Sequence, residues 1–109
     1  MDRPLLVYTT FPDSETALAI GRELVAARLA ACVNVLPGMR SVYAWKGAIE
    51  RDEEVVAIVK TREGLRDAVA EALKVRHPYE TPIIVFLEVA GAHPATLAWL
   101  LGETGDETS

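Results

Sequence analysis

The chain has 109 residues, the size of one domain, and half of them are apolar, enough for a buried core. Sixteen acidic against eleven basic residues give a net charge of −5. Because binding to nucleic-acid phosphates needs clustered lysine and arginine, this balance disfavours a nucleic-acid partner.

The single cysteine, Cys32, excludes a disulfide within the chain and suits a reducing compartment. The N-terminal residues lack the basic flank and long apolar segment of a secretory signal. No segment has the roughly 20 apolar residues of a membrane span. We therefore expect a cytoplasmic protein with no membrane partner.

The first two elements are a strand and a helix. An apolar, β-prone run over residues 5–10 ends at Phe11-Pro12, and Asp13 or Ser14 can cap a helix. At 100° per residue, the apolar positions of 15–29 fall on one broad side, which predicts a helix with one buried face.

Two long strands follow. Residues 32–36 have strand character, Pro37-Gly38 interrupts them and 39–45 resume, which indicates a bend or bulge on an edge strand. A hairpin turn is predicted at 46–48, followed by a second long strand over 49–60.

The second helix has the cleanest helical pattern of the chain. Thr61 is its predicted N-cap, with Glu63 in the first turn, and its apolar residues between 65 and 75 share one side. It should end before His77, because a residue that precedes proline is pushed out of the α region.

The last elements are a strand over 83–89 and a short helix over 95–101. The order β-α-β-β-α-β predicts an α+β protein with a ferredoxin-like antiparallel sheet, two helices on one face and a short C-terminal helix. We expect a single domain over 1–102 and an acidic, disordered tail over 103–109.

Two of the predicted strands are apolar on both faces. Both odd and even positions are apolar in residues 55–59 and 83–87, a pattern typical of strands that are buried on both sides. Two helices can cover only one side, and an exposed apolar sheet face is an interaction surface. We therefore expect an obligate oligomer whose subunits bury the second face.

Two segments resemble the divalent-cation-tolerance protein family CutA. They are LAACVNVLPGMRSVYAWKGAIERDEEVVAIVKTRE (29–63) and RHPYETPIIVFLEV (76–89), and the resemblance extends over about 5–101. It implies a ferredoxin-like subunit in a compact homotrimer, with strands that pair across subunits. It also implies a role in the response to metal ions and in tolerance to divalent cations such as copper.

The resemblance also points to metal ligands. In some members of the family, ligation is assigned to a cysteine at the end of the first strand and to two adjacent histidines before the proline. These positions hold Thr9 and Arg76-His77 in this chain, so His77 alone matches. We expect no required cofactor and at most weak binding of Cu(II) or another divalent cation.

The residues themselves leave both metal candidates open. His77 is either a metal ligand or a histidine at a helix C-terminus, where a positive charge is favoured. Cys32 is either a soft ligand for copper or zinc, or a small buried residue at the start of a strand.

Aromatic and charged residues indicate a second candidate site, a cleft between subunits. Tyr43, Trp45 and Tyr79 either line such a cleft or pack at the subunit contact. Lys60 and Glu80 either pair with each other or bind an anion.

Three acidic residues alternate along one strand face. Glu50, Asp52 and Glu54 could gather a hard cation, but such a row is more often a solvated face that discourages edge pairing, and we interpret it so.

A catalytic set is missing from the sequence, so we do not expect an enzyme. Both histidines adjoin a proline, no nucleophilic triad or phosphate loop is present, and no arginine loop of the acylphosphatase kind follows the first strand. Besides metal tolerance, two alternatives remain: a signalling trimer that binds a small effector, and a structural or partner-anchoring trimer without a ligand.

Overall fold

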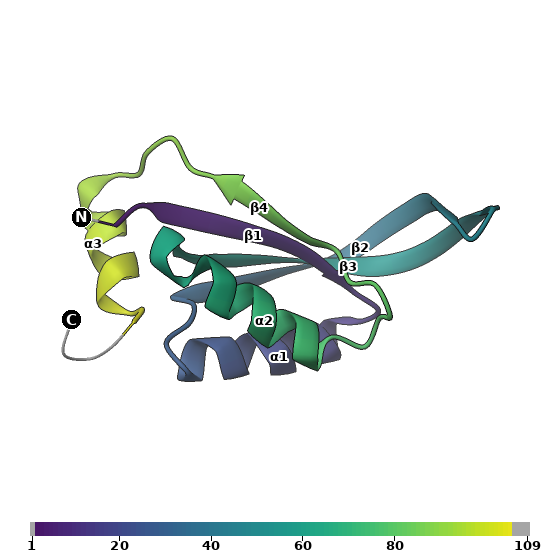
Figure 1. Ribbon diagram of the computed structural model, residues 1–109, viewed down its shortest axis with the longest axis horizontal. Coiled ribbons are helices and arrows are strands. Elements are labelled where there is room, and N and C mark those ends of the chain that lie inside the picture. Colours follow the sequence, from purple (N-terminus) through teal and green to yellow (C-terminus); the bar gives the residue numbers. More distant parts are fainter. Residues whose placement is uncertain (1, 106–109) are drawn as a thin grey trace.

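The computed structural model describes residues 2–105, which form a four-stranded antiparallel sheet with strand order β2-β3-β1-β4. In Figure 1, α1 and α2 lie side by side on one face of the sheet, and α3 lies at the end where β1 begins. The predicted ferredoxin-like α+β fold is confirmed. The elements are β1 (Pro4–Phe11), α1 (Ser14–Ala26), β2 (Cys32–Trp45), β3 (Ala48–Arg62), the 3₁₀ turn η1 (Glu63–Leu65), α2 (Arg66–Arg76), β4 (Ile84–Glu88) and α3 (Pro94–Gly102).

The core lies between the sheet and the two long helices. Alternate residues of β1 and β3, such as Leu5, Val7 and Val59, point to this side and are fully buried. The helices contribute the residues of their apolar sides, including Leu24 and Leu73.

A glycine brings α1 close to the strand at the edge. A Cβ atom at Gly21 would lie only 3.1 Å from the Cβ of Val33, so glycine permits the close approach of helix and strand.

The opposite face of the sheet is uncovered. Leu36, Val85 and Leu87 are 53%, 46% and 44% exposed on β2 and β4, and the strand pairing places them on the side away from the helices. Helix α3 contacts β3 and β1 only at one end of the sheet. The predicted apolar second face is therefore present, and we call it the open face.

The β2–β3 hairpin extends beyond the other elements (Figure 1), and the whole molecule measures 48 × 25 × 22 Å. Its register shifts between Leu36 and Met39, where Gly38 has a φ of +84°. This confirms the predicted bulge on an edge strand. Lys46 and Gly47, both at positive φ, form the two-residue turn, as hairpin twist requires.

The starts and ends of the helices differ in part from prediction. Asp13 caps α1 as predicted, because its carboxylate accepts the Thr16 N–H at 2.8 Å. The helix ends at Ala26 rather than 29, since Arg28 adopts a left-handed φ of 60°. Thr61 is not the N-cap of the second helix. It pairs with Leu5 inside β3, is buried, and its hydroxyl donates to the carbonyl of Leu29 at 2.7 Å.

The C-terminal segment packs on the domain further than predicted. Thr104 is buried, and its hydroxyl accepts a bond from Arg62 at 2.9 Å. Arg28 donates to the Gly105 carbonyl at 2.8 Å. The prediction of a disordered tail from residue 103 is therefore wrong for 103–105, and the remainder, 106–109, lies outside the described residues. No helix between residues 2 and 105 is long and apolar enough to cross a membrane.

Candidate functional site

A cleft of about 720 Å³ opens where the hairpin meets β1 and the segment before β4. Its volume lies within the ~300–1,000 Å³ typical of small-molecule sites. All three tyrosines of the chain line it, together with one tryptophan and two carboxylates of β3. These residues are Tyr8, Tyr43, Tyr79, Trp45, Asp52 and Glu54.

Two phenols of the cleft donate to its carboxylates. Tyr79 donates to Glu54 at 2.7 Å, and Tyr43 donates to Asp52. Burial, followed by the bond to Glu54, raises the pKa of Tyr79, and the bond to Asp52 raises the pKa of Tyr43 to about 12. Both phenols are thus neutral near pH 7, and the two carboxylates give the cleft a negative charge.

One ammonium group lies against two residues that line the cleft. The Nζ of Lys46 is 3.8 Å from a Glu80 carboxylate oxygen and 5.5 Å from the centre of the Trp45 ring. Both contacts are solvent-exposed, so they contribute little to stability.

His77 lies behind the cleft and joins three elements. Its Nε2 is 2.7 Å from the Thr10 carbonyl, which can only accept, so Nε2 carries the proton. Its Nδ1 accepts the Tyr79 N–H at 3.2 Å, and its ring stacks on Phe11 with centroids 4.4 Å apart. Neither nitrogen of the neutral ring has a free lone pair for a metal ion in this arrangement.

Burial lowers the pKa of His77 from its ordinary value of 6.5, against the raising effects of the Thr10 carbonyl and Glu54. As predicted, the helix ends here, and the His77 N–H donates to the Leu73 carbonyl at 2.9 Å. Burial therefore disfavours the positive charge that was one alternative for a histidine at this helix C-terminus.

The predicted metal residues do not meet. Cys32 lies at the start of β2 opposite Lys60, whereas His77 contacts the last residues of β1. Two of the positions matched to the family do come together, because the Thr9 hydroxyl lies 3.4 Å from His77 Nε2. The third, Arg76, turns away to Glu23 at 3.1 Å. In the part of the chain that the structure describes, no three His, Cys, Asp or Glu side chains form a group able to hold a metal.

Three of the four predicted cleft residues lie in the cleft. Trp45, Tyr79 and Glu80 line it, whereas Lys60 pairs with Leu6 and Cys32, further along the open face.

The sequence analysis missed several residues of the cleft. Tyr8, Thr10 and Met39 line it, and Tyr8 and Thr10 share a strand parity that could have indicated a common face. Glu54 was interpreted as part of a solvated row, because its partner Tyr79 is 25 residues away in the chain.

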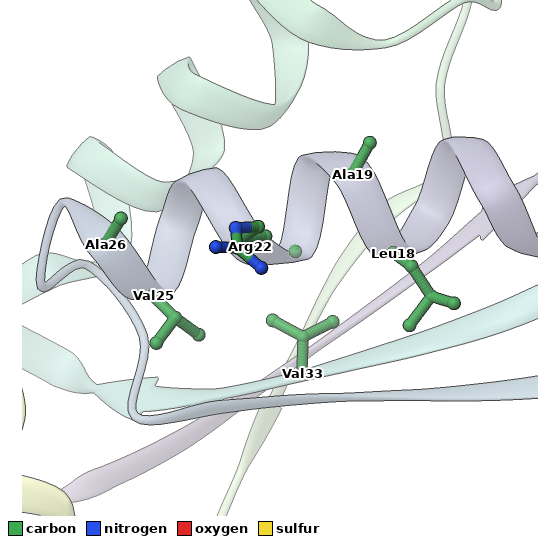
Figure 2. Close-up of a pocket in the computed structure, with 7 residues that line it drawn as sticks. Leu18, Ala19, Arg22, Val25, Ala26 and Val33 are labelled. Atoms are coloured by element: carbon green, nitrogen blue, oxygen red, sulfur yellow. The ribbon is translucent and has the colours of Figure 1, made fainter.

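A second depression, along α1, has little chemistry. Figure 2 shows Leu18, Val25 and Val33 around the groove between α1 and the neighbouring strand. Arg22 is its one charged lining residue, so this groove lacks the convergent polar groups of a ligand site.

Comparison with known proteins identifies the family. The family model for the CutA1 divalent ion tolerance protein matches residues 5–103. The chain belongs to the CutA1 family. The predicted resemblance is thereby confirmed over almost the whole described chain.

Curated CutA proteins and solved CutA1 structures agree. The divalent-cation tolerance protein CutA of Pyrococcus horikoshii is 45% identical over 100 residues, which cover 92% of this chain and 97% of that protein. "Protein CutA 1, chloroplastic" of Oryza sativa is 39% identical, and the matched residues cover 92% of this chain but only 56% of that protein. The crystal structure of CutA1 from Ehrlichia chaffeensis superposes with a TM-score of 0.92 at 31% identity, covering 96% of this chain and 98% of that one.

Proposed function

We propose that this CutA family chain acts in the cytoplasm as a homotrimer in tolerance to divalent cations, without catalytic activity of its own. The observation that carries the proposal is the apolar open face. Leu36 on one edge strand and Val85 and Leu87 on the other are exposed there, and burying apolar surface contributes about 25 cal/mol per Å². A second copy is the natural cover for this face, and the projecting hairpin offers an edge strand for pairing.

The assembly is tested by multi-angle light scattering over a range of concentrations. The wild type should have the mass of three chains. Val85→Glu places a charge on the open face and should yield smaller species, whereas Val75→Glu, an equal change at a residue 65% exposed on α2, should leave the trimer intact. A folded wild-type monomer at all concentrations would exclude the proposed trimer.

Cation binding is proposed to be weak, and His77 is the candidate ligand on which it depends. The described residues hold no ready group of three ligands, and a metal at His77 Nδ1 would have to displace the Tyr79 N–H. Cys32, which lies elsewhere, would bind independently.

Calorimetry with Cu(II), Zn(II) and Ni(II) tests this part of the proposal. We expect low-affinity heat with Cu(II), reduced in His77→Ala and unchanged in His93→Ala, the other histidine; Cys32→Ser tests the thiol. Absence of heat at roughly millimolar metal, the weak end of metal affinities in proteins, would remove metal binding from the proposed function and leave the trimer untouched.

A second candidate function is binding of a small effector. The volume and aromatic lining of the cleft favour it over a trimer without a ligand. In an assembly, a neighbouring subunit would close the cleft, and Lys60 remains a predicted member of such a shared site.

A further inference from the structure

The side chains of the cleft are those that recognise an organic cation. Four aromatic rings (Tyr8, Tyr43, Trp45 and Tyr79) line it beside Asp52 and Glu54. Aromatic faces attract cations through their ring quadrupole, and carboxylates add charge and accept N–H bonds. Met39 and Ile83 supply apolar surface in the same cleft, where a hydrocarbon chain can pack.

The chain has an ammonium group of its own beside the cleft. The Lys46 ammonium lies against Trp45 and Glu80, as the distances above record. It shows that the Trp45 ring and the Glu80 carboxylate, which both line the cleft, can hold an ammonium group.

A second, independent observation also points to a ligand. Thr10 lines the cleft and is only 5% exposed, yet its hydroxyl oxygen has no hydrogen-bond partner among residues 2–105. Buried polar groups are almost always paired, so the unpaired hydroxyl of this cleft residue points to a partner from outside the described chain. An ammonium group carries donors only, which suits a hydroxyl oxygen and two carboxylates.

An inorganic divalent ion fits this cleft less well. The Glu54 and Asp52 carboxylates each already accept a phenol proton. A hard cation would need six or more converging oxygens, and the described chain contains no cluster of three metal-binding side chains.

We propose that the cleft binds a small-molecule alkylammonium ion, a primary ammonium on a short hydrocarbon chain. The ammonium group lies between the carboxylates of Glu54 and Asp52 and the aromatic rings, and the chain packs along Met39 and Ile83. This inference rests on the effector-binding candidate above and is independent of copper binding.

The probe is 1,4-diaminobutane, titrated into the purified full-length wild-type protein by calorimetry or NMR, with 1,4-butanediol as its uncharged analogue. We expect saturable binding of the diamine and none of the diol. Glu54→Gln should weaken binding at least about tenfold, as loss of a charge-assisted contact predicts.

The matched control is Glu53→Gln, the same change one residue away, where the side chain is exposed and pairs with Arg40 outside the cleft. It should bind the diamine like the wild type. Equal binding of the diol, equal losses in Glu53→Gln and Glu54→Gln, or no binding at roughly millimolar diamine, the weak limit of specific affinities, would each overturn the proposal. The wild-type comparison of diamine and diol decides the matter even where a variant fails to fold.

Light scattering on the same samples separates this proposal from the proposed assembly. An intact trimer that ignores the diamine counts against the ammonium site alone. A monomer that binds the diamine counts against the trimer alone.

Discussion

The two faces of the sheet use the same strands but have different surroundings. On the helix side, Leu5, Val7 and Val59 are fully buried under α1 and α2. On the open side, Val85 and Leu87 are about half exposed although their neighbours in β4 pack on the core. An apolar residue in a strand therefore need not belong to the chain's own core, because an exposed apolar sheet face is also an interaction surface.

The largest expected effect comes from a substitution on the face of the sheet that α1 and α2 cover. Leu5→Ala should lower the free energy of unfolding by about 2–5 kcal/mol, because it leaves a cavity in a closely packed core. Its matched variant, Leu87→Ala on the open face, should cost below about 1 kcal/mol in the dissociated chain. Urea unfolding at two protein concentrations measures both: the Leu87→Ala loss should grow with concentration as the assembly forms, and the Leu5→Ala loss should not vanish on dilution. Equal, concentration-independent losses would mean that the two faces do not differ.

A smaller effect is expected at the histidine that ties β1 to the loop before β4. His77→Gln should lower the free energy of unfolding by about 1–3 kcal/mol, because it removes the ring that stacks on Phe11 and the nitrogen that accepts the Tyr79 N–H. His93→Asn is the control, since asparagine can replace His93 as the N-cap of α3. Chemical denaturation measures both, and similar losses in the two variants would contradict the special role of His77.

The hairpin offers a test in the region outside the core. Gly47→Ala should cost about 1–2 kcal/mol, because Gly47 has a φ of +82° that an L side chain adopts only with strain. Gly91→Ala introduces a methyl group with nothing within 4 Å and without a positive φ, so it should be close to neutral. Thermal unfolding compares the two, and a neutral Gly47→Ala would indicate that the turn rearranges freely.

The smallest effect expected is the pH dependence due to His77. Its pKa is lower in the folded than in the unfolded chain, so its stabilising contribution is complete above the unfolded value of 6.5 and is lost as pH falls below it. The stability difference between wild type and His77→Gln should therefore shrink from about pH 8 to about pH 5. Unfolding curves at both pH values measure this difference. Growth of the difference at low pH would mean that the folded protein favours the charged ring.

Features determined by neighbours in sequence were predicted well. The Asp13 cap, the bulge at Pro37-Gly38 and the end of the helix before His77 each depend on local backbone preferences. The prediction of Thr61 as a helix N-cap was wrong, because β3 pairs with β1 through Thr61 and Leu5, past the point where local signals favour a helix.

The site was predicted only in part, for the same reason. Trp45, Tyr79 and Glu80, predicted for a cleft between subunits, line the cleft of the single chain, whereas Tyr8, Thr10 and the contact of Glu54 were not predicted. Nothing local distinguishes Glu54 from its acidic neighbours. Its contact with Tyr79 exists only because the chain returns from α2 beside the hairpin.

By itself the sequence determined the order of elements, the family and the apolar character of both faces, because these follow from side-chain chemistry and short-range spacing. Only the tertiary structure decided which face the helices cover, that His77 is a buried neutral ring apart from Cys32, and that the tyrosines meet two carboxylates in one cleft. These outcomes depend on contacts between strands and loops far apart in the chain, and local sequence preferences do not determine such contacts.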